Sequence, residues 1–135
     1  TLSSMIKLSD SVNQPMCQEA VTTIYIERLE YLKKMTDLID PLNWIFICYD
    51  DLLNNSEENL KNLTNFLALK EPLKKEYHLK SFTQKWGDPS KNITKGEIFK
   101  TPSDKVKIEA ELLKRAAKVY NETYIFLKSK SMFNT

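Results

Sequence analysis

The chain has 135 residues, of which 41% are apolar and 28% charged, and its net charge is +2. This length allows one domain and not two, and the composition predicts a folded core rather than disorder. A single histidine, two glycines and a mild net charge exclude multi-histidine sites and glycine-rich phosphate loops, and argue against a nucleic-acid-binding surface.

The first half of the chain predicts a lead-in, a long helix and a strand. Residues 1–12 are rich in serine and form either a frayed lead-in or a short strand. The spacing predicts a helix over 15–39, with Pro15 at its first position and Asp40-Pro41 ending it, because a proline disfavours helical geometry in the residue before it. Its apolar residues at helical spacing are Cys17, Val21, Ile24, Leu32, Met35 and Leu38.

The run at 43–49 is continuously apolar and rich in aromatic and β-branched residues. Such a run is typical of a strand that is covered on both faces, as in a parallel sheet with helices above and below. The sequence therefore predicts one buried strand near 43–49.

The second half predicts a turn, two helices and a long loop. Residues 50–55 are expected to form a turn, and Asn55 with Glu58 to cap the next helix. The buried stripe of that helix comprises Leu60, Leu63, Phe66 and Leu67. Residues 73–102 form a long loop, and a final helix starts at 102–104 with apolar residues spaced alternately by four and three: Val106, Ala110, Leu113, Ala117, Tyr120, Tyr124 and Leu127. This stripe packs within the domain or forms a coiled-coil seam.

A doubly covered strand cannot stand alone, because its backbone donors and acceptors need neighbours on both edges. The order of elements is that of part of a doubly wound α/β domain. We therefore interpret residues 1–135 as a single, partial domain whose other strands come from upstream chain or from a second subunit.

Two cysteines, Cys17 and Cys48, are too few for a disulfide scaffold and are expected to be buried free thiols in a reducing compartment. No stretch of 18 apolar residues and no signal-peptide core is present. We expect a cytoplasmic protein without a membrane span.

Two motifs resemble the sulfotransferase family. Members carry an apolar strand ending in Tyr-Glu-Asp-Leu, a turn, and a helix ending in Phe-Leu-Gly-Leu. Here the motifs read Tyr49-Asp50-Asp51-Leu52 and Phe66-Leu67-Ala68-Leu69, so that an aspartate and an alanine replace the glutamate and the glycine. The resemblance covers residues 20–95, and implies that the chain is the C-terminal part of a P-loop-like, doubly wound parallel-sheet fold.

The resemblance also implies a reaction, the transfer of a sulfonate group from 3′-phosphoadenosine 5′-phosphosulfate (PAPS) to a hydroxyl or amine acceptor, without a metal. The family's phosphate loop and its catalytic base have no counterpart here, so this segment alone is not expected to catalyse. Residues 82–92 resemble the family's closing loop. By this resemblance Lys85 contacts the 3′-phosphate, Trp86 stacks on the nucleotide and Gly87 shapes the turn; the alternative is a solvated Lys85 and a Trp86 that anchors the loop.

A second function remains open on the residues themselves. The chain can instead be a mostly helical interaction module, without catalysis, whose apolar run and last helix pair with a partner protein.

Overall fold

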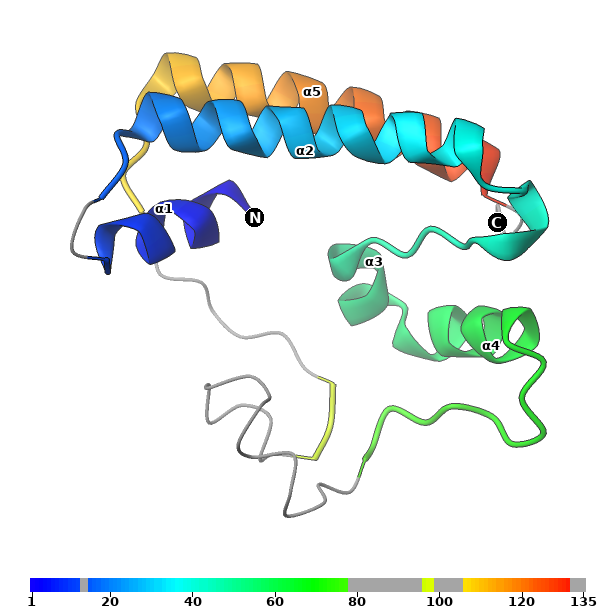
Figure 1. The fold of residues 1–135 in the computed structure, drawn as a ribbon. Helices are drawn as coiled ribbons and strands as arrows, with labels where there is room; N and C mark the ends of the chain where they lie inside the picture. Colours follow the sequence, from blue (N-terminus) through cyan, green and yellow to red (C-terminus); the bar gives the residue numbers. More distant parts are fainter. Residues whose placement is uncertain (13–14, 78–95, 99–105, 132–135) are drawn as a thin grey trace. The chain divides into compact units, whose positions relative to one another are not determined.

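The computed structural model describes residues 1–12, 15–77, 96–98 and 106–131 (Figure 1). Within these ranges the chain is helical and forms two compact units. The first unit is Thr1–Phe46 with Ser103–Thr135, and the second is Ile47–Pro102. The expectation of a single partial domain stays a prediction. The helices are α1 (Leu2–Asp10), α2 (Gln18–Leu38), α3 (Tyr49–Asn54), α4 (Ser56–Phe66) and α5 (Ala110–Lys130), with a 3₁₀ turn at Pro41–Asn43.

The first unit is built on α2 and α5, which lie side by side and run in the same direction (Figure 1). Arg115 near the start of α5 pairs with Glu19 near the start of α2, at 2.8 Å. At the other end Lys130 pairs with Asp37, also at 2.8 Å. All four side chains are well exposed, so each pair is worth at most about 1 kcal/mol. These pairs show that the two helices are parallel, but they contribute little to the stability of the helix pair.

The backbone before α5 is held by one amide side chain of α2. The Gln18 Nε2 group donates to the carbonyl of Lys107 at 3.0 Å, and its Oε1 accepts from the N–H of Glu109 at 3.2 Å. This double contact leads the chain into α5 beside the first turn of α2. The predicted helix start at 102–104 lies largely outside the described residues, and residues 106–109 are not helical.

The prediction of a lead-in or strand for residues 1–12 is wrong, because residues 2–10 form helix α1. The side chain of Thr1 caps this helix by accepting from the N–H of Ser4 at 3.3 Å. Leu2 and Ile6 are one turn apart and both buried, and they form the core of the unit with Val21 of α2 and Ala116 of α5. This local four-residue apolar spacing is typical of a helix and not of a strand.

The predicted buried strand near 43–49, and with it the parallel-sheet fold, is also wrong. The described residues contain no β-strand, and residues 44–48 are half-buried rather than covered on both faces. The backbone is extended at both ends of this segment, at Trp44 and Cys48. Phe46 contacts α5 instead of a second strand: its N–H donates to Ser131 Oγ at 3.2 Å, and its ring meets Tyr124 edge-on at 5.9 Å. A run of β-formers without a partner strand is extended but forms no ladder.

The buried face of α5 differs from the predicted stripe. The buried residues are Leu112, Ala116, Thr123 and Leu127, whereas Leu113 and Ala117 are exposed. The prediction considered apolar residues only. Over most of the helix it placed the stripe one residue C-terminal to the buried face that the structure shows. Thr123, which is 2% exposed, could not be found by a search for apolar side chains.

In the second unit, residues 50–54 are not a turn but belong to helix α3, and Asn55 follows that helix. The next helix, α4, starts at Ser56 as expected after Asn55, although the Asn55 side chain makes no capping hydrogen bond. Its buried residues are Ser56, Leu60 and Thr64, so that Leu67 of the predicted stripe is exposed.

A Schellman motif ends α4. The N–H of Ala68 donates to the carbonyl of Asn65 and the N–H of Leu69 to that of Thr64, each at 3.1 Å. The motif requires a left-handed residue, and Ala68 takes this place with a φ of 49°. Thr64 also holds the chain that follows, since its hydroxyl accepts from the N–H of Leu73 at 2.9 Å and donates to the carbonyl of Leu60.

We expect Ala68→Gly to stabilise the protein. The left-handed conformation strains an alanine but not a glycine, so the free energy of unfolding should rise by about 1 kcal/mol. Urea unfolding followed by far-UV circular dichroism measures the change. Ala117→Gly is the matched control, because Ala117 is exposed inside α5 and its replacement should cost about 0.5–1 kcal/mol. A loss of stability on Ala68→Gly would contradict the left-handed assignment.

Candidate interaction surface

The residues predicted to bind a nucleotide, Lys85, Trp86 and Gly87, lie outside the described residues. The structure does describe the chain on both sides of them. Glu76 and Glu97 form an antiparallel bridge, in which the N–H of Tyr77 donates to the carbonyl of Gly96 at 2.7 Å. The chain before residue 78 and the chain after residue 95 are therefore held together.

Gly96 is needed at this bridge for two reasons. Its φ of 73° lies in the left-handed region, which a side chain disfavours. A Cβ atom at this position would also lie 3.1 Å from the carbonyl oxygen of Tyr77. The sequence placed Gly96 only within a long loop, because a bridge of single residues leaves no periodic signal.

Within the described ranges no three His, Cys, Asp or Glu side chains gather in a way that could hold a metal ion. Neither cysteine forms a disulfide, but Cys17 is exposed, which corrects its prediction as buried, and Cys48 is half-buried. Where helices are described, none is long and apolar enough to cross a bilayer.

Exposed apolar side chains are the most unusual feature of the first unit. Its described part exposes more large apolar side chains than it buries, whereas large exposed apolar patches usually mark binding surfaces. The exposed residues are Leu8, Val12, Met16, Tyr31, Leu32, Leu38, Leu42, Leu113 and Ile125.

Helix α2 carries the most exposed of these side chains, Leu38, on one regular stripe. Leu38 is 80% exposed and Tyr31 is 62% exposed, and they lie two turns apart on the same face. Spacings of four and three residues connect them to further members of this face. We call it the α2 stripe: Ala20, Ile24, Glu27, Tyr31, Lys34 and Leu38.

The rest of the unit holds this stripe in place. Val21 and Thr22 are buried on other faces of the helix, and the Thr22 hydroxyl, fully shielded from solvent, donates to the carbonyl of Gln18 at 2.7 Å. With α1 and α5 packed against α2, the helix is a rigid support for its exposed side chains.

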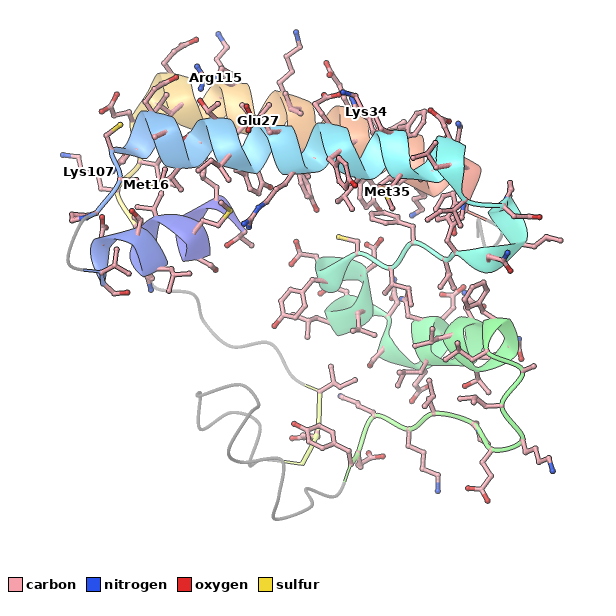
Figure 2. All side chains as sticks on the ribbon, viewed as in Figure 1. Met16, Glu27, Lys34, Met35, Lys107 and Arg115 are labelled. Carbon is pink, nitrogen blue, oxygen red and sulfur yellow. The ribbon has the colours of Figure 1, made fainter. Side chains whose placement is uncertain are left out.

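Two opposite charges lie within the stripe. Glu27 and Lys34 are two turns apart and exposed, and Figure 2 places them along the same edge of α2, with Met35 at the other edge. Neither pairs with an opposite charge among the residues described. By contrast, Arg115 of α5 is paired with Glu19.

Sequence reasoning used Ile24 and Leu38 only as apolar residues at helical spacing in the 15–39 helix, and so missed the stripe. The sequence did contain a signal for this exposed stripe, namely the width of the apolar pattern around the helix. Val21, Ile24, Tyr31, Leu32 and Leu38 cover more of the helix surface than one packing face needs.

Comparisons with known proteins add no assignment, since no protein family, curated protein or solved structure matches this chain.

Proposed function

We propose that the chain is a helical protein-interaction module and that the α2 stripe is its binding surface. The exposure of Leu38 and Tyr31 on a helix that packs against α1 and α5 carries this proposal. Burial of a leucine side chain contributes about 1.5–3 kcal/mol, and tyrosine is enriched among the side chains that dominate binding energy. The two cysteines form no disulfide, which fits a reducing compartment such as the cytoplasm.

Site-specific photo-crosslinking tests the proposal. A photoreactive phenylalanine analogue is placed at position 38 of the full chain, and separately at position 122, an exposed position of α5. In cells that express the chain, we expect one discrete adduct from position 38 and none from position 122. Mass spectrometry identifies the protein in the adduct, and the complex is then rebuilt from purified components. Equal, diffuse crosslinking from both positions would contradict the proposal.

A sulfotransferase-like function is a second candidate, and one observation favours it. Ala68 adopts a left-handed conformation at the position where the family's Phe-Leu-Gly-Leu motif has its glycine. The corrected fold gives this candidate no parallel sheet, so that it depends on the motifs alone. It retains PAPS as the donor, a hydroxyl or amine as the acceptor, and Lys85, Trp86 and Gly87 as the nucleotide contacts.

Calorimetric titration with adenosine 3′,5′-bisphosphate tests the second candidate. We expect binding that Lys85→Ala weakens about tenfold, the effect of losing one charge-assisted contact. Nucleotide should also change the tryptophan fluorescence, and Trp86→Phe should abolish this change while Trp44→Phe preserves it. The absence of binding heat in the intact chain would rule this candidate out.

A further inference from the structure

The α2 stripe is complementary to itself, and we propose that it binds the α2 stripe of a second copy in antiparallel orientation. This inference rests on the proposed interaction function and names the partner. It follows from the spacing of the stripe, the sizes of its side chains and the placement of its two charges.

The spacing sets the register. Alternating steps of four and three residues form the seam by which two helices pack along their length. A two-fold axis between Glu27 and Tyr31 places Ala20 opposite Leu38 of the second copy, and Leu38 opposite its Ala20. Leu38, the most exposed large apolar side chain among the described residues, then meets Ala20, the smallest side chain of the stripe.

The charges fit the same register. Lys34 lies opposite Ile24 of the second copy, so that its aliphatic stem can cover Ile24 while its ammonium group reaches Glu27 one turn further. The two-fold axis repeats this contact, which gives two equivalent Glu27–Lys34 ion pairs. Both groups lack an opposite charge among the described residues, and both obtain one in the dimer. Parallel pairing in register would instead place Glu27 beside Glu27 of the second copy, and Lys34 beside its Lys34, so that like charges would meet.

An apolar partner of another kind would leave these two charges unexplained. A second copy supplies both opposite charges at the required spacing. The contact is a single helix pair and is therefore small, and we expect a dissociation constant on the order of 10 µM.

Sedimentation velocity of the full chain, from about 1 to about 200 µM, measures the association. We expect a concentration-dependent monomer–dimer equilibrium. Leu38→Glu should weaken it about a hundredfold, because two leucines leave the contact and two charges enter it. A chain that stays monomeric over the whole range would overturn the proposal.

Charge exchange tests the register itself. Glu27→Lys and Lys34→Glu should each weaken the dimer about tenfold, since two attractive pairs become repulsive. The double variant restores opposite charges and should return the dissociation constant to within about twofold of the original. Glu122→Lys on α5 makes the same charge change outside the stripe and should have no effect. A dimer that the double variant does not restore would overturn the antiparallel register.

The experiments distinguish a failure of the self-association proposal from a failure of the proposed interaction function. If position 38 crosslinks to a different protein while the chain stays monomeric, the self-association is wrong and the interaction function stands. If position 38 gives no discrete adduct at all, both are wrong.

Discussion

Replacing Ile6 by alanine is expected to lower the free energy of unfolding by about 2–4 kcal/mol, because a large buried side chain leaves a cavity. Ile6 is 1% exposed and lies where α1 meets Val21 of α2 and Ala116 of α5. The described core of this unit is small, so few neighbours can move to fill the space. Urea unfolding followed by far-UV circular dichroism measures the loss.

Leu8→Ala is the matched control for this experiment. Leu8 belongs to the same helix but is 68% exposed, so that its truncation should change stability by less than about 0.5 kcal/mol. Equal losses from the two variants would show that α1 does not pack through Ile6.

Enlarging Ala116 should have the second large effect. Ala116 is 2% exposed in the core where α1, α2 and α5 meet, and a leucine there has no space. We expect Ala116→Leu to lower the free energy of unfolding by about 2–3 kcal/mol through overpacking. Thermal unfolding of the purified chain would show the same change as a lower midpoint temperature.

Ala117→Leu differs by one position and should be nearly neutral, within about 0.5 kcal/mol, because Ala117 is exposed. The apolar pattern of the sequence places Ala117 in the packed stripe, whereas the structure places Ala116 there. The pair of variants therefore decides which register α5 uses. A larger loss from Ala117→Leu would support the pattern and contradict the structure.

The parts of the fold that depend on local signals could be predicted. The 15–39 helix was expected from Pro15 and Asp40-Pro41 and is found as α2, three residues shorter at its start. Helix α4 begins where Asn55 predicted it, and a long final helix is present as α5. Caps, prolines and a four-residue apolar spacing act within a few residues, so a single sequence contains them.

The errors at 43–49 and in α5 arose where structure depends on distant residues, whereas helix α1 was missed although its four-residue apolar spacing is a local signal. The 43–49 run has the composition of a buried strand, but a strand needs a partner, and composition cannot show whether one is present. The packed face of α5 was misplaced because Thr123 is buried and Leu113 is exposed. Which face of a helix meets its neighbour depends on the neighbour.

The candidate surface was missed for the same reason. Leu38 and Ile24 were used only as apolar residues at helical spacing, and that spacing predicts a helix without showing which of its faces is covered. The charges within the stripe, Glu27 and Lys34, indicate solvent on that side, but only the position of α5 shows which side is covered. For Lys85, Trp86 and Gly87 the nucleotide assignment stays a prediction.

The parallel arrangement of α2 and α5 has a consequence for how the chain reaches this structure. The side-chain contacts that join the two helices connect residues 92 to 96 positions apart. Helical proteins usually fold fast because their contacts are local, whereas distant contacts first require the closure of a long loop. Because the second unit lies between α2 and α5 in the sequence, the helix pair can form only when the loop that contains this unit closes. We therefore expect the chain to fold on the slower timescale that is typical of β-rich domains.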